Sequence, residues 1–222
     1  VCLDQRGHGD SGWPREPDYD RNTQADDLEA VLEGLALSRP VVVAMSMGGL
    51  NAMTWASRPT SDPRALILVD ISPEVRVEGV SAIHDFIRNN DVLPSFEAFV
   101  ERAHAFNPRR SLDNLRSRLG HNLKRLDDGN WTWKYDPALR SPAAAVGDLE
   151  GLWAEIAAID CPTLAVKGAE SPVVSPQAIA RLTETIADCR SVEIAGAGHS
   201  VMGDNPEAFS RAVLLFLDHT LG

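Results

Sequence analysis

One serine lies in a setting that is typical of a catalytic nucleophile. Residues 44–49 read AMSMGG, and they overlap the end of the apolar run 41–45. If a buried strand turns sharply into a helix at Ser46, its hydroxyl is exposed at the carboxyl edge of a sheet and its backbone is strained. The small residues Ala44 and Gly48 allow strand and helix to crowd there, with Ala in place of the first glycine of G-x-S-x-G. The pattern predicts a nucleophile elbow; the alternative is a serine that only caps a helix.

A serine nucleophile needs a base, and His199 is the histidine best placed to act as one. It lies in the loop 195–206 (AGAGHSVMGDNP) after an apolar run, where small residues let the imidazole approach a sheet edge. The backbone N–H of Met47, directly after the nucleophile, would supply one oxyanion donor. The other histidines lie in expected helices, near the chain end or in a glycine-rich turn: His8, His84, His104, His121 and His219.

The elements that must position these residues follow an alternating pattern. Apolar runs without polar alternation favour a parallel sheet covered on both faces. They lie at 1–4, 41–45, 65–70, 163–167 and 191–195. Helices are expected at 23–37, after Ser46, at 176–187 and at 206–221, the last two beginning with proline. Alternation of strand and helix predicts an α/β fold.

Residues 73–147 interrupt this alternation. Helices are expected there at 80–90, 95–106 and 111–126, and they indicate an insertion carried by the α/β core. In 131–136 (WTWKYD), the three aromatic residues share one face if the stretch is extended. They would either line an apolar substrate pocket or pin the insertion to the core.

Composition excludes several classes of partner. The net charge of −11 argues against nucleic acid and anionic membranes, which need clustered Lys and Arg. No apolar run approaches the roughly 18 residues that span a bilayer. The three cysteines form no metal motif or disulfide framework, which favours free thiols and a cytoplasmic location. Residue 1 is Val, so any signal peptide would lie upstream.

A glycine-rich stretch imitates a cofactor motif. Residues 7–12 (GHGDSG) match G-x-G-x-x-G, the pattern that holds a dinucleotide at a helix N-terminus. The next residues, 13–22 (WPREPDYDRN), contain prolines and acids that disfavour a helix and repel phosphate. We therefore expect a turn there, and neither an organic cofactor nor a metal.

Three motifs together resemble the α/β-hydrolase fold superfamily: 4–11 (DQRGHGDS), 44–49 (AMSMGG) and 196–200 (GAGHS). The resemblance runs from the family's fourth core strand to the end of the chain. It implies a mostly parallel sheet with helices on both faces, formed by 1–73 and 147–222, and a helical cap at 74–146. The family's opening strands, with the second oxyanion donor, are expected upstream of Val1.

The resemblance leaves the acid of the triad open. The family usually has Asp a few residues after the glycine that ends the seventh strand, and Ser171 and Pro172 stand there in this chain. Glu170 is the only acid in that loop and is the first candidate. Asp70, at the end of the run 65–70, is the second, because some members draw the acid from that strand.

These residues favour a serine hydrolase that acts on carboxylic esters of small molecules. Ser46 would attack the acyl carbon, His199 would transfer the proton and a carboxylate would orient the imidazole. Hydrolysis of a carbon–carbon or amide bond uses the same groups. The alternative from another class is a small-molecule binding protein or receptor on the same fold that has lost turnover. The sequence defines no oligomeric state.

Overall fold

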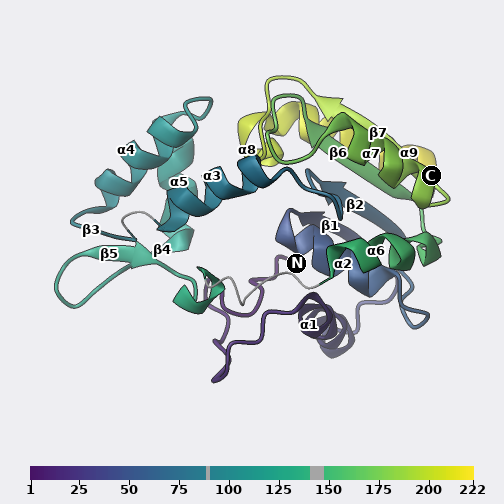
Figure 1. The fold of residues 1–222 in the computed structure, drawn as a ribbon, viewed down its shortest axis with the longest axis horizontal. Helices are drawn as coiled ribbons and strands as arrows, with labels where there is room; N and C mark the ends of the chain where they lie inside the picture. The colour runs from purple at the N-terminus through teal and green to yellow at the C-terminus, as the bar shows by residue number, and fades with distance from the viewer. Residues whose placement is uncertain (89–90, 141–147) are drawn as a thin grey trace. The chain divides into compact units, whose positions relative to one another are not determined.

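The computed structural model describes residues 1–88, 91–140 and 148–222 of the chain. The chain divides into two compact units. Figure 1 labels their helices and strands. One comprises Tyr19–Val80 and Val146–Gly222, and the other comprises Val1–Asp18 and Ser81–Ala145. The first 18 residues thus group with the segment expected to form the cap.

The first unit is built on a four-stranded parallel sheet. Its strands are β1 (Val41–Met45), β2 (Ala65–Val69), β6 (Thr163–Gly168) and β7 (Cys189–Ile194), in the order β1-β2-β6-β7. All three pairings are parallel, with Val41 opposite Ala65 and Leu66 opposite Thr163. Four of the predicted runs form this sheet. The fifth predicted strand is wrong, because residues 1–4 form no strand in the structure.

Both faces of this sheet are covered. Every residue of β2 is buried, although successive side chains point to opposite faces. On one face, Ile67 and Val69 share a cluster with Phe216. The helices of this unit are α1 (Arg21–Gly34), α2 (Met47–Ala56), α6 (Leu149–Glu155), α7 (Pro176–Thr185), α8 (Val201–Asp204) and α9 (Pro206–Leu221), with a 3₁₀ turn at Ile156–Ala158. Helix α3 (Val77–Arg88) begins in this unit and ends in the other.

The second unit has its own core and its own sheet. In this core, Phe99 and Val100 of α4 (Phe96–Phe106) cluster with Leu115 and Leu119 of α5 (Leu112–Asn122). The strands β3 (Val92–Leu93), β5 (Trp131–Trp133) and β4 (Leu123–Arg125) form an antiparallel sheet in that order, and a 3₁₀ turn follows at Pro137–Arg140. The sequence reading missed this sheet because its strands have two or three residues, too few for a periodic signal.

The aromatic row of the insertion packs inside its own unit. Trp131 contacts Phe96 edge-on at 5.4 Å between ring centroids, and Trp133 contacts Phe99 at 5.2 Å. Both tryptophans pack against the core cluster of this unit. Their contacts are therefore those of core side chains.

The first residues of the chain pack against the end of the same aromatic row. His8 forms a β-bridge with Tyr135, and the N–H of Gly9 donates to the carbonyl of Lys134 at 2.7 Å. The segment between Trp13 and Asp20 contains no helix. The dinucleotide interpretation of 7–12 therefore lacks the helix N-terminus that it requires.

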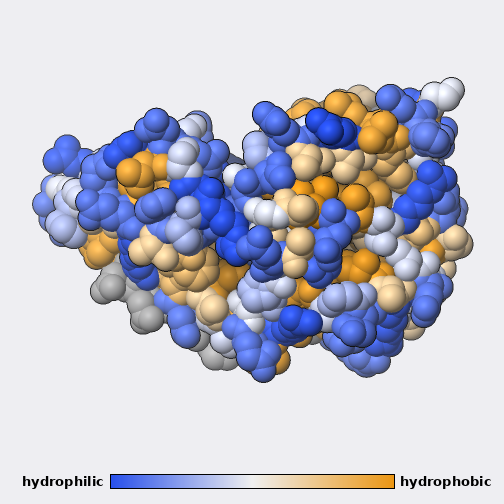
Figure 2. Space-filling model, turned by 90° about the horizontal axis from the view of Figure 1, so that it is seen from above, coloured by the Kyte–Doolittle hydropathy of each residue, from blue (hydrophilic) through white to orange (hydrophobic). Residues whose placement is uncertain are grey.

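On the face shown in Figure 2, hydrophilic residues predominate and apolar patches lie among them. Exposed apolar side chains include Leu214 and Leu215 of α9 and Val41 and Val43 of β1. Within the described ranges, no helix combines the length and the apolar character that a membrane span requires.

Candidate active site

Ser46 occupies a strained turn between β1 and α2. Its φ and ψ are 52° and −128°, values that few residues other than glycine adopt. Its N–H donates to the carbonyl of Val69 at 3.1 Å, which fixes the turn at the end of the neighbouring strand. The side chain makes no capping hydrogen bond to α2, so the interpretation of Ser46 as a helix cap is wrong. A Cβ at Gly49 would overlap the side chain of Ile71, which explains the second glycine of the motif.

His199 reaches this serine from the loop that follows β7. Its Nε2 lies 3.1 Å from Ser46 Oγ. Gly196 turns the chain at a φ of 69°, and the N–H of Gly198 donates to the Asp204 carboxylate at 2.9 Å. The turn at Gly196 precedes His199, and the hydrogen bond from Gly198 to Asp204 closes the loop around it. The His199 side chain is 16% exposed.

Asp70 holds the other side of the ring. It follows β2 directly, is fully buried and has a φ of 51°. Its Oδ2 lies 2.8 Å from His199 Nδ1, and its Oδ1 accepts a hydrogen bond from the N–H of Gly168 at 3.0 Å. Ser46, His199 and Asp70 all belong to the first compact unit.

The first choice for the partner of the imidazole, Glu170, needs correction. The carboxylate against His199 is that of Asp70, the second choice. Glu170 is exposed, and its backbone N–H donates to the carbonyl of Ala197 at 2.9 Å, so this position ties the loop after β6 to the histidine loop through the main chain. That the end of β2 faces the histidine depends on the order of the strands in the sheet, which no single loop sequence indicates.

The hydrogen bonds define which ring nitrogen can act as a base. A carboxylate only accepts, so Nδ1 carries the hydrogen that is donated to Asp70. The lone pair is then on Nε2, which faces the hydroxyl of Ser46. This arrangement can remove the hydroxyl proton as the oxygen attacks an electrophile. Met47 is the first residue of α2, where an N–H has no acceptor within the helix.

Ser171 is a neighbour of the Asp70 carboxylate that the sequence analysis did not identify. The hydroxyl of Ser171, which is 6% exposed, donates to Asp70 Oδ2. A signal was present, because Ser171 stands where the resemblance places the acid.

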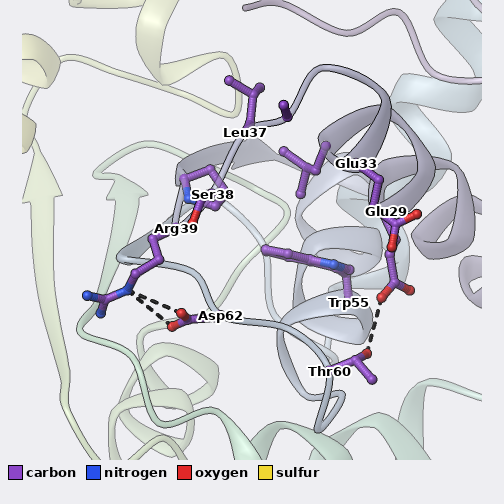
Figure 3. A pocket seen from close by; sticks show the side chains of 11 residues that line it. Glu29, Glu33, Leu37, Ser38, Arg39, Trp55, Thr60 and Asp62 are labelled. Atoms are coloured by element: carbon purple, nitrogen blue, oxygen red, sulfur yellow. Dashed lines mark hydrogen bonds and ion pairs between the residues drawn. The ribbon is translucent and has the colours of Figure 1, made fainter.

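A pocket of about 360 Å³ lies away from these residues (Figure 3). It is lined by residues that precede β1, including Arg39, and by Trp55 of α2, so it lies at the end of β1 opposite Ser46. Within it, Arg39 bonds Asp62 at 3.3 Å, and the Thr60 hydroxyl donates to Glu29 at 3.1 Å. Because it lies at the opposite end of β1, it contributes no side chain to the surroundings of Ser46. In the described part of the chain, no cluster of three or more His, Cys, Asp or Glu residues is arranged to hold a metal.

Comparison with known proteins places this geometry in a family. A sequence model described as "Alpha/beta hydrolase family" matches residues 1–212. The chain belongs to the alpha/beta hydrolase family. It is 34% identical over 226 residues to the esterase Rv0045c of Mycobacterium tuberculosis, covering 98% of this chain and 74% of that protein. It is 27% identical to the esterase YbfF of Escherichia coli, covering 98% of this chain and 82% of the relative.

Solved structures give the same assignment. The M. tuberculosis esterase Rv0045c superimposes with a TM-score of 0.81 at 33% identity, over 96% of this chain and 74% of that one. E-2-(acetamidomethylene)succinate hydrolase superimposes with a TM-score of 0.82 at 26% identity, over 96% and 79% of the two chains. The fold predicted from the sequence motifs is confirmed, and this alpha/beta hydrolase is an enzyme of the hydrolase class.

Proposed function

We propose that this alpha/beta hydrolase is a serine esterase that uses Ser46, His199 and Asp70 as its catalytic triad. The observation that carries the proposal is the continuous path from Ser46 Oγ to His199 Nε2 at 3.1 Å and from His199 Nδ1 to Asp70 Oδ2 at 2.8 Å. The strained backbone of Ser46 supports it, because strain of this kind is characteristic of a nucleophile elbow. Two of the relatives are named esterases.

The proposed reaction has two halves. Ser46 Oγ attacks the acyl carbon while His199 Nε2 takes its proton, and the negative oxygen that forms is stabilised by the N–H of Met47. His199 then gives the proton to the departing alcohol, which leaves an acyl group on Ser46. A water molecule, deprotonated by the same Nε2, attacks the acyl group and releases the acid. Asp70 keeps the ring in the correct tautomer and stabilises the imidazolium in both halves.

The proposed substrates are small-molecule carboxylic esters, because two of the relatives are named esterases. Ester hydrolysis needs only a nucleophile, a proton shuttle and oxyanion donors, so no metal or organic cofactor takes part in the proposed reaction. A cytoplasmic location is proposed because Cys2, Cys161 and Cys189 are free thiols, which persist in a reducing compartment.

Hydrolysis of a short p-nitrophenyl ester by the intact protein tests the proposal. We expect turnover in the native protein and its loss, by at least about 1,000-fold, in Ser46→Ala. Ser57→Ala is the control, because Ser57 lies at the other end of α2 and bonds the carbonyl of Thr54. Unchanged turnover in Ser46→Ala would refute the nucleophile. Binding of the ester without turnover in the native protein would favour the receptor alternative.

A further inference from the structure

Asp70 is held on both of its carboxylate oxygens. Oδ1 accepts from the Gly168 N–H at 3.0 Å, and Oδ2 accepts from the Ser171 hydroxyl as well as from His199 Nδ1. Ser171 is thus the one side chain besides His199 with a recorded hydrogen bond to this carboxylate in the described residues. Asp70 is fully buried and Ser171 is 6% exposed, so water has little access with which to replace this bond.

The hydroxyl of Ser171 has a defined direction. Its oxygen accepts a hydrogen bond from the N–H of Val173 at 3.1 Å, so its own hydrogen must be donated elsewhere. The carboxylate of Asp70 can only accept, and it is the recorded acceptor. A hydrogen bond to a charged group is stronger than one between neutral groups. The hydrogen bond from Ser171 therefore stabilises the orientation of Asp70 in which Oδ2 faces both Ser171 and His199.

The loop that carries Ser171 is fixed from several sides. The N–H of Ser171 donates to the carbonyl of Gly168 at 3.0 Å, and the N–H of Arg76 donates to the carbonyl of Val173 at 2.8 Å. A Cβ at Gly79 would overlap the carbonyl of Pro172, so the first turn of α3 packs directly on this loop. The Ser171 hydroxyl is therefore presented by a rigid backbone.

We propose that Ser171 is a positioning residue of this esterase, which orients the Asp70 carboxylate toward His199 and thereby supports proton transfer at Ser46. The inference rests on the proposed function. It assigns a role to the position at which the family usually has the acid: the carboxylate comes from β2, and a hydroxyl at the former acid position holds it in place.

The first test compares two serine variants of one loop in the intact protein. Ser171→Ala removes the donor to Asp70, whereas Ser175→Ala removes the cap of α7, where Ser175 Oγ accepts from the Ala178 N–H at 3.0 Å. Steady-state hydrolysis of a p-nitrophenyl ester and thermal unfolding are measured for both. We expect Ser171→Ala to lower kcat about 10- to 100-fold with KM unchanged, as a lost hydrogen bond to a charged group predicts. Ser175→Ala should lower Tm and leave kcat unchanged.

The second test is a double-mutant cycle with Asp70→Asn, read out as the rate of fluorophosphonate labelling. If Ser171 acts through Asp70, Ser171→Ala slows labelling strongly in the native background and less than about twofold in the Asp70→Asn background. Equal losses in both backgrounds would overturn the inference. Should Ser171→Ala be too unstable to assay, Ser171→Cys takes its place with the same expectation, because a thiol of similar size is a weak donor.

The two proposals fail in distinguishable ways. If Ser171→Ala keeps full kcat while Asp70→Asn and Ser46→Ala lose theirs, the positioning role is overturned and the esterase mechanism stands. If Ser46→Ala and Asp70→Asn also keep full turnover, the esterase mechanism itself is overturned.

Discussion

Ser46 and Asp70 are both held with a positive φ, at 52° and 51°. Such conformations cost about 1–3 kcal/mol for a residue other than glycine and persist only where neighbours enforce them. The N–H of Asp70 donates to Val166 at 2.7 Å and that of Ser46 donates to Val69 at 3.1 Å, so sheet hydrogen bonds enforce both turns. The strain directs both side chains toward His199.

Replacement of Ser46 by glycine should exchange function for stability. Glycine adopts this conformation without strain, so we expect Ser46→Gly to unfold with a free energy about 1 kcal/mol higher than Ser46→Ala, while both variants are inactive. Denaturant unfolding of the two variants measures the difference. Equal stabilities would show that the turn is not strained in solution.

Asp70 and Glu170 are the two candidates for the triad acid, and replacing each carboxylate by its amide distinguishes between them. Asp70→Asn should lower ester turnover by up to about 10,000-fold, because the neutral side chain favours the wrong imidazole tautomer. Glu170→Gln should change turnover less than about twofold, because the carboxylate against His199 Nδ1 is that of Asp70 and Glu170 is exposed. Steady-state kinetics on one p-nitrophenyl ester decides between them, and the reverse pattern would restore Glu170.

At the scale of elements, the loops after β6 and β7 support each other. The N–H of Ala169 donates to Ile194 at 3.0 Å and that of Glu170 donates to Ala197 at 2.9 Å. Gly168 permits this contact, because a Cβ there would overlap the carbonyl of Gly198 and lie 2.7 Å from that of Ala197. The same glycine donates to Asp70, so it joins the acid and the base loops.

Gly168→Ala is therefore expected to damage both stability and activity. The obstructing atoms are backbone, which cannot rotate away, so we expect a loss of about 1–3 kcal/mol in unfolding free energy and reduced ester turnover. The control is Gly120→Ala in the exposed part of α5, where a Cβ meets nothing within 4 Å. That variant should be about 0.5–1 kcal/mol more stable than the native protein. Equal stability of Gly168→Ala and the native protein would contradict the close contact of the two loops.

The sequence predicted the elements unequally well. Continuous apolar strands and proline-initiated helices are local signals, and β1, β2, β6, β7, α7 and α9 were found at nearly their observed bounds. The apolar side chains of α1 are at most half-buried, apart from Ala25, and Leu35, which caps its C-terminus, is 52% exposed. Instead, α1 buries Arg21, which bonds both carboxylate oxygens of Glu155 at 2.6 Å. These hydrogen bonds raise the pKa of Arg21. An ion pair across 134 residues leaves no local pattern in the sequence.

At the scale of the whole molecule, the site joins residues that lie far apart in sequence. Ser46 and His199 were identified from motifs, because each needs a particular turn chemistry beside it. The acid has no such motif. Its identity depends on which strand end faces the histidine, and residues 70 and 199 are 129 positions apart.

Strand β1 lies at an edge of the sheet: among the described strands its one neighbour is β2, and Val43 is 47% exposed. The expectation of further strands upstream stays a prediction.

The three thiols should differ in reactivity across the molecule. Burial raises the pKa of Cys189 to about 12 and also raises that of Cys161, because the charged thiolate is poorly solvated there. At pH 8 both therefore stay protonated and react slowly, whereas Cys2 is exposed. Alkylation of the native protein with iodoacetamide, followed by peptide mass spectrometry, should label Cys2 first. Equally fast labelling of Cys189 in the folded protein would contradict the raised pKa of its thiol.

The central claim is that Ser46 is an activated nucleophile, and reaction of the intact protein with a fluorophosphonate probe tests it most directly. The geometry of Ser46, His199 and Asp70 predicts one covalent adduct per chain, mapped by mass spectrometry to Ser46 and absent in Ser46→Ala. The account would be contradicted if the folded protein formed no adduct, or if the adduct mapped to another serine and persisted in Ser46→Ala.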